Sequence, residues 1–447
     1  MRLSPALVAL AGFAASAAGE EPELLPALLV SAPPLPAVAP AVDLTAAGGP
    51  GRPAGTLAEA GRAIPGLLVL ESFGGFEPPR LSLRGSGLQS APSSRGVRLL
   101  LDGSPLNLAD GSFNSALLDA SLCDQLDAWR GPDAWRTAPA VAGGALDFRA
   151  RPAAEDGAAT RVEAGSFGGW RAGAATVLAE GKTVAALRAS AAGMDGWREH
   201  SAQSRTALLG TVGRTLAGGL RAAVEVYQVN AHYEVPGPLT LAVAHAAPRS
   251  ISADVRRDQP DRVAAVSRLA ASLSRKTADE SWNLTAALMR TTDDFRQLQS
   301  AGITTFRSYD VNLRASYGRA FNAAGRPELR ATLEADRGWR DQWRYVNAAG
   351  QAGSAFGHDG LFPTTATAEV EAAFNLAPSL RATLGLARVE ARRDIADRFG
   401  VGSTSTRKVS SGATLPAAGL QWRGPGARRC SPMSQPRRSP RPMTTCW

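Results

Sequence analysis

The side chains of this chain that are best suited to hold a metal compound are histidines beside a phenol or a carboxylate. His232 precedes Tyr233, and His358 precedes Asp359. Imidazole nitrogens and phenolate or carboxylate oxygens are common metal ligands, so each pair could help to hold a metal chelate. The charged run Arg256-Arg257-Asp258 could bind a charged chelate as easily. All of these residues could equally be solvated loop residues, and both interpretations stay open at this point.

Catalytic constellations are not found in the sequence. Gly181-Lys182-Thr183 ends like a phosphate-binding loop, but Thr176 stands where that motif needs its first glycine. The patterns HExxH and GxSxG do not occur. The three cysteines, Cys123, Cys430 and Cys446, lack the CxxC spacing of a zinc site. The sequence therefore predicts neither an enzyme nor a resident metal ion or cofactor.

The net charge of +9 invites a nucleic-acid-binding interpretation, but the location of the charge argues against it. Residues 423–447 contain no acid and hold the arginines that make up most of the excess: Arg423, Arg428, Arg429, Arg437, Arg438 and Arg441. The rest of the chain is close to balanced and has no basic face interleaved with stacking aromatic residues. We therefore expect no nucleic-acid partner.

The first residues have the form of a secretory signal. Arg2 is followed by the apolar stretch from Ala6 to Ala15, and Ala15-Ser16-Ala17 has the small-x-small form of a cleavage site. We assign residues 1–19 to this signal. No later stretch reaches about 18 apolar residues, which a membrane-spanning helix needs. A membrane location would therefore require β-strands.

Residues 160–422 alternate apolar and polar side chains with period two, as in Leu329 to Asp336. The pattern predicts about twelve antiparallel strands. Most connections alternate between short turns and long loops, with long loops expected at 193–204, 231–261, 292–305, 339–364 and 393–410. Short turns at one end and long loops at the other are typical of a transmembrane β-barrel rather than a soluble sandwich. Aromatic residues near strand ends fit interfacial girdles: Trp170, Tyr227, Trp282, Tyr309, Phe321 and Trp339.

A series of glycine-punctuated strand ends precedes the alternating region. They are Ile64-Pro65-Gly66, Leu83-Arg84-Gly85, Leu101-Asp102-Gly103, Trp129-Arg130-Gly131 and Gly143-Gly144-Ala145. In this order and at these gaps, they resemble the plug domain of TonB-dependent outer-membrane receptors. The resemblance implies an α+β plug domain at residues 57–152, followed by a partial β-barrel at residues 160–422.

The resemblance also implies roles for particular residues. Residues 20–56 are rich in proline, alanine and glycine and read as a flexible segment. Within it, Leu28, Leu29, Val30, Ser31 and Ala32 resemble a TonB box, which adds as a strand to a partner sheet. In the family, plug arginines at the motifs of Arg84 and Arg130 pair with acids on the inner barrel wall.

The family function implied here is uptake of a scarce ligand across the outer membrane. The expected ligand is an iron–siderophore or another metal complex, held by the external loops, with His232, Tyr233, His358 and Asp359 as candidates. The expected partners are a TonB-type energy-transducing protein of the inner membrane and outer-membrane lipid. A small outer-membrane barrel with a periplasmic domain, acting as an adhesin or structural protein, is the alternative.

The chain departs from the family in length. Family barrels close with about 22 strands, and a barrel of about twelve would be too narrow to hold a plug domain. After Leu420-Gln421-Trp422 the alternation stops, and residues 423–447 read as a disordered tail. If the codons of this tail are read two bases out of phase, they can encode residues that resemble a barrel strand and turn of the receptor family. We therefore expect a frameshifted, truncated and non-functional receptor fragment, against the alternative of a genuine basic tail.

Overall fold

The computed structural model describes residues 41–44, 55–62, 64–72, 77–86, 95–129, 137, 141, 143–150, 156–400 and 406–422. The expected signal segment, the TonB-box segment Leu28–Ala32, the motif residues Arg130 and Gly131, and the tail at 423–447 lie outside these residues. Within the described residues, no helix is both long enough and apolar enough to cross a membrane.

The N-terminal part of the chain forms a small mixed sheet in the order β1-β6-β7-β4-β5. Its strands are β1 (Ala41–Asp43), β4 (Arg98–Leu101), β5 (Ser104–Pro105), β6 (Gln125–Trp129) and β7 (Ala145–Arg149). β4 runs parallel to β7, and the other neighbours are antiparallel. The apolar run of β4 is buried, and the chain then turns sharply at Asp102 and Gly103, whose φ angles are 48° and 80°. Glycine suits such a turn because it has no Cβ.

Short helices and a hairpin complete this domain. Helix α1 (Leu57–Gly61) begins with a capping box between Thr56 and Glu59. It ends before Pro65-Gly66, where Gly66 has a φ of 80°. Strands β2 (Leu67–Leu70) and β3 (Arg80–Leu83) pair as a separate hairpin. The 3₁₀ helices η3 (Ser115–Leu117) and η4 (Ala120–Leu122) lie between β5 and β6.

Residues 156–422 contain a 12-stranded antiparallel sheet in which every strand pairs with its neighbours in sequence. Its strands are β8 (Gly157–Ala164), β9 (Trp170–Glu180), β10 (Thr183–Met194), β11 (Gln203–Thr215), β12 (Leu220–Glu234), β13 (Asp261–Lys276), β14 (Glu280–Arg296), β15 (Ile303–Ala320), β16 (Glu328–Ala348), β17 (Gln351–Ala377), β18 (Leu380–Asp397) and β19 (Thr406–Trp422). In the described part of the chain β8 and β19 are edge strands, so the sheet is not closed. The predicted fold class, a plug-like α+β domain followed by an incomplete barrel of about twelve strands, is confirmed.

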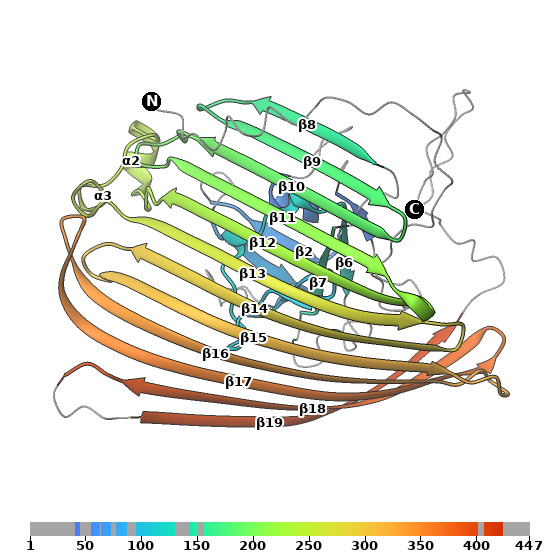
Figure 1. Ribbon diagram of the computed structural model, residues 1–447. Helices are drawn as coiled ribbons and strands as arrows, with labels where there is room; N and C mark the ends of the chain where they lie inside the picture. Colours follow the sequence, from blue (N-terminus) through green and yellow to red (C-terminus); the bar gives the residue numbers. More distant parts are fainter. Residues whose placement is uncertain are drawn as a thin grey trace.

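The sheet curves around the N-terminal domain, with β2, β6 and β7 on its inner side (Figure 1). One hydrophobic cluster crosses the boundary: Leu99, Leu117 and Phe148 of the small domain belong to it, as do Tyr227 and Val266 of the sheet. The opposite face exposes a different set of apolar side chains: Leu178, Leu187, Leu288, Leu313, Leu333 and Leu386. The period-two pattern therefore separates an inner wall, which packs on the plug, from an outer face.

The expected long loops are largely replaced by longer strands. The range 339–364 contains only the turn Ala349-Gly350, because β16 runs to Ala348 and β17 begins at Gln351. The range 292–305 shrinks to 297–302 in the same way. In these two ranges charged and aromatic residues alternate, and a strand accommodates both residue types outside its apolar band. Among the described connections, 235–260 is the longest and carries helices α2 (Leu241–Ala246) and α3 (Ala253–Asp258), and the predicted loop at 193–204 remains as 195–202.

The location of Tyr227 also differs from the prediction. The sequence places it in an interfacial girdle, but it is on the inner wall and only 1% exposed. Trp170, Tyr309, Phe321 and Trp339 are exposed, as a girdle requires. The sequence shows that alternate residues of a strand share a face. It does not show which of the two sets points inward, because the register of the strand decides that.

Candidate functional site: plug–wall contacts and the external mouth

The plug segment from Ser104 to Asp119 lies along the inner wall and makes buried polar contacts with it. The Tyr227 hydroxyl donates to the carbonyl oxygen of Leu117 at 2.9 Å and accepts from the Asp119 amide at 3.2 Å. The Asp119 carboxylate accepts from Ser190 Oγ at 2.6 Å and lies 3.3 Å from Arg205 Nε. Burial raises the pKa of Asp119, but Arg205 and the hydroxyl donors outweigh it and hold the pKa below its ordinary value. Asp119 is therefore an ionised anchor.

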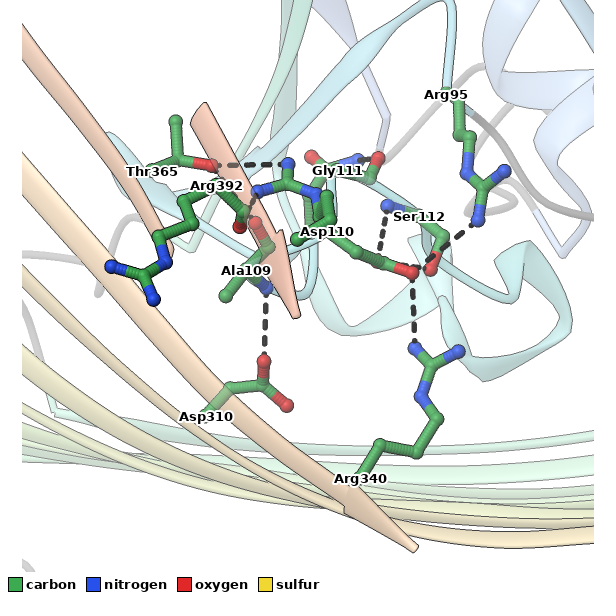
Figure 2. A network of polar contacts seen from close by, with 11 residues as sticks. Arg95, Ala109, Asp110, Gly111, Ser112, Asp310, Arg340, Thr365 and Arg392 are labelled. Carbon is green, nitrogen blue, oxygen red and sulfur yellow. Dashed lines mark hydrogen bonds and ion pairs between the residues drawn. The ribbon is translucent and has the colours of Figure 1, made fainter. Parts of the chain in front are cut away.

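A second group of contacts surrounds the turn at Ala109 and Asp110 (Figure 2). The Ala109 amide donates to Asp310 at 2.9 Å, and its carbonyl accepts from Thr365 Oγ1 at 3.0 Å. The Asp110 carboxylate lies 3.3 Å from Arg95 of the plug and 3.3 Å from Arg340 of the wall. Burial raises the pKa of Asp110, but Arg340 and hydrogen bonds from Ser112 lower it further than burial raises it. One carboxylate thus joins a plug arginine to a wall arginine.

At this contact the wall residue Gly338 has no side chain. A Cβ built on Gly338 would lie 3.2 Å from the Ala109 Cβ and 3.0 Å from Pro363 Cγ. Both distances are tighter than ordinary side-chain contacts. The absence of a side chain at Gly338 therefore lets the plug backbone reach Asp310.

Three further ion-paired arginines link the two parts. Arg98 of the plug pairs with Glu334 of the wall, which also binds Arg314. Arg268 of the wall pairs with Glu225 and donates to Ser104 Oγ at 2.5 Å. Arg188 lies 2.6 Å from Asp124 and donates to the Leu122 carbonyl at 2.9 Å. Sequence reasoning missed these contacts because each joins residues far apart in the chain.

The plug motifs lie at turns rather than at the wall. Arg84 is exposed, has a φ of 55° and has no acidic partner among the described residues, while Gly85 follows it with a φ of 83°. Among the described residues, Arg98 is a plug arginine that pairs with an acid of the wall. Gly143 packs where a Cβ would meet Ser86 Oγ and the Gly96 carbonyl, and Gly144 has a φ of 114°.

The candidate ligand residues are split between the two faces of the sheet. His232 is on the outer face, with Nε2 3.5 Å from Asp261, whereas Tyr233 is buried on the inner wall and accepts from Arg262 at 3.4 Å. Consecutive strand residues point to opposite faces, so the pair cannot converge on one ligand. Across the part of the chain that the structure describes, no group of three histidine, cysteine or acidic residues could hold a metal ion.

His358 and Asp359 are separated in the same way. The His358 ring stacks on Trp343 with centroids 3.8 Å apart, and its Nε2 lies 2.7 Å from Asp341. Asp359 instead pairs with Arg344 at 2.8 Å. Asp258, from the charged run in the long connection, is fully buried and is bound by Arg257 and the Gln299 amide.

The inner wall above the plug is lined by arginines that lie over aromatic rings. We call this surface the external mouth. The Arg340 guanidinium lies 4.5 Å from the centre of the Phe306 ring, and the Arg262 guanidinium lies 4.7 Å from that of Phe295. Arg262 also pairs with Asp293 at 2.7 Å, and Asp293 accepts from Asn114 of the plug at 3.1 Å. Such a surface suits anionic, planar groups.

Comparison with known proteins agrees with this architecture. Residues 43–145 match the TonB-dependent Receptor Plug Domain. The ferric citrate transporter FecA, in its unliganded form, is 17% identical with a TM-score of 0.75, and the match covers 87% of this chain and 61% of FecA. The ferric yersiniabactin uptake receptor FyuA from Yersinia pestis is 13% identical with a TM-score of 0.64, covering 86% and 61%.

The alcaligin receptor FauA from Bordetella pertussis is 17% identical with a TM-score of 0.61, covering 83% of this chain and 58% of FauA. The chain thus spans less than two thirds of each of these receptors. Residues 43–145 thus match the plug-domain family, and the described chain shares its fold with these receptors.

Proposed function

We propose that the protein is an outer-membrane receptor that binds an anionic iron(III) chelate at its external mouth and admits it when the plug is displaced. The observation that carries this proposal is the Arg95–Asp110–Arg340 contact. Arg95 has a side chain that is 58% exposed, whereas the Arg340 side chain is only 11% exposed. A ligand can therefore reach one end of a contact whose other end is the wall.

Guanidinium groups bind carboxylate and other oxyanions through paired hydrogen bonds. An anionic chelate at Arg95 competes with Asp110 for that guanidinium. Asp110 then pairs with Arg340 alone, so ligand binding changes the charge balance at one of the contacts that seat the plug. The names of the similar receptors FecA and FyuA, which mention ferric citrate and ferric yersiniabactin, support an iron chelate as the ligand class.

We also propose that a TonB-type protein of the inner membrane supplies the force. The segment Leu28–Ala32 has the mainly apolar composition of segments that add as a strand to the edge of a partner sheet. Pulling on it would act on the plug, whose polar contacts with the wall can exchange with water. Water can replace the partners of polar groups in this way, but it cannot replace those of apolar groups.

The test is chelate binding to the purified full chain, with ferric citrate and ferric siderophores as probes and tryptophan fluorescence as readout. Arg95→Gln is expected to weaken binding of the preferred chelate by about tenfold or more, as loss of a charge-assisted contact does. Arg381→Gln is the matched control, because Arg381 pairs with Glu328 at 2.7 Å beside the opposite, short-turn end of the sheet. Absence of binding by every chelate, or equal losses in both variants, would refute the proposal.

A further inference from the structure

Exposed arginines gather on the outer face of the sheet, on the side away from the plug. Arg290 of β14, Arg307 of β15 and Arg337 of β16 are exposed, and each alternates with inner-wall neighbours. Arg290 and Trp339 both sit directly across from Tyr309 in the register, so the arginines surround this exposed tyrosine. We call these residues the outer arginine patch.

The patch arginines lack the ion pairs that neutralise three other outer-face arginines. Arg388 pairs with Glu390, Arg392 lies 2.9 Å from Asp394, and Arg398 lies 3.1 Å from Asp341. Arg290, Arg307 and Arg337 make no ion pair with any described residue. Asp341 lies across from Arg307 in the register, but it is already bound by Arg398 and His358.

Aromatic and apolar surface continues from the patch along the same strands. The Arg337 guanidinium lies 5.1 Å from the centre of the Trp339 ring. Towards the short-turn end of the sheet, the outer face exposes Leu288, Leu313 and Leu333 at 56%, 51% and 62%. A shallow, mostly apolar groove of about 340 Å³ lies there, with Leu284, Leu313 and Leu333 in its lining and the paired Arg388 and Glu390 at its side. Unpaired positive charge beside an apolar groove is complementary to an anionic amphiphile.

We propose that the outer arginine patch binds the headgroup of a lipid that carries more than one phosphate, with an acyl chain in the adjacent groove. A phosphate monoester carries a charge of about −1.5 to −2 at neutral pH, so several guanidiniums match more than one such group. Arginine binds phosphate through a bidentate fork, and the exposed tyrosine and tryptophan rings suit the boundary between headgroups and acyl chains. The inference rests on the proposed outer-membrane location and deepens it by naming the lipid class.

The experiment reconstitutes the full chain into phosphatidylcholine nanodiscs that contain a diphosphoryl glucosamine lipid, its monophosphoryl analogue or neither. Bound lipid is counted by native mass spectrometry. The wild type is expected to hold the diphosphoryl lipid about tenfold more tightly than the monophosphoryl lipid. The triple variant Arg290→Gln/Arg307→Gln/Arg337→Gln is expected to lose that preference, whereas lysine at all three positions retains most of it because the charge remains.

The matched control removes a paired charge from the same face, outside the groove lining: Arg392→Gln, whose partner is Asp394. It is expected to bind lipid within about twofold of the wild type, because paired exposed charges contribute little. Unchanged binding in the patch variant, equal binding of both lipids, or displacement by soluble pyrophosphate as effective as by lipid would each overturn the proposal. Chelate binding separates the two proposals. If the patch variant still binds the chelate but no longer binds the lipid, the lipid site is supported independently of the receptor function. If the wild type binds no chelate, the proposed receptor function fails.

Discussion

At the scale of single residues, Gly338 has the clearest steric role. Gly338→Ala would place a Cβ 2.5 Å from Asp310 Oδ1 and 3.2 Å from the Ala109 Cβ, so Asp310 or the plug turn must shift and the Ala109–Asp310 hydrogen bond is disturbed. We expect the seated plug to lose about 1–3 kcal/mol, the usual cost of overpacking. The measurement is the urea midpoint for protease cleavage of the plug. Gly173→Ala is the control, because its Cβ would meet nothing closer than 3.7 Å. Equal midpoints for the two variants would remove this role for Gly338.

The sequence predicted the turns of the plug but not its partners. Asp102, Gly103 and Gly144 have the positive φ angles that their motifs indicate, because turn chemistry is local. The ion pair between Arg98 and Glu334 joins residues 236 positions apart. Nothing in the local pattern distinguishes Arg98 from Arg84, because the choice depends on how the plug is oriented inside the wall.

At the scale of elements, the strands were predicted better than their ends. The alternation of β13 to β18 is strong enough to place each strand, but Trp339 to Tyr345 read as a loop because charged residues interrupt its apolar face. In the structure these residues continue β16. Hydrogen bonds to β15 and β17 extend the strand whether its side chains are apolar or polar, and a single sequence does not show that pairing.

The external connections are tied together at Asp258, the last residue of α3. Its side chain accepts from the Gln299 amide at 2.8 Å, and its carbonyl accepts from Asn347 Nδ2 at 2.9 Å. We predict that Asp258→Ala loosens 297–302, because the Gln299 amide loses its acceptor, whereas the 349–350 turn keeps its contact with the backbone carbonyl of Asp258. Hydrogen exchange should accelerate at 297–302 and stay unchanged in the bodies of β14 and β16.

Asp254→Ala is the control for this prediction, because the Asp254 side chain is 64% exposed in the same helix. It should leave exchange in both connections unchanged. Faster exchange confined to α3 in the Asp258 variant would show that 297–302 is independent of it.

At the scale of the whole molecule, the plug is held against the wall by both apolar and charged contacts. Leu99, Leu101 and Phe148 belong to a hydrophobic cluster that continues into the wall, and Asp110, Asp119 and Arg98 form ion pairs with wall residues. Buried ion pairs add little stability compared with apolar packing, but removing one partner is costly. Loss of one partner of a wall ion pair would therefore weaken the seat while the apolar packing remains.

The pH dependence of the seat follows from the carboxylates that face the wall. The pKa of Asp119 is lowered in the folded protein, so the ionised form stabilises the seat above the ordinary aspartate pKa of about 4. That contribution is lost as the pH falls through the lowered pKa of the folded state. Asp102 and Asp147 act in the opposite sense, because burial raises the pKa of each, and they partly mask the effect in the wild type.

A variant comparison isolates Asp119. At neutral pH, Asp119→Asn should destabilise the seated plug by about 3–5 kcal/mol, because Arg205 then lacks its carboxylate in a buried site. The difference from the wild type should shrink as the pH falls from the ordinary aspartate pKa of about 4 through the lowered pKa of the folded state, below which Asp119 is also neutral in the seated plug. Urea midpoints of plug release between neutral pH and the acid limit measure this difference, and Asp102 and Asp147 cancel because both proteins contain them. A difference that stays constant across the whole range would mean that Asp119 stabilises the seat through its hydrogen bonds alone, without its charge.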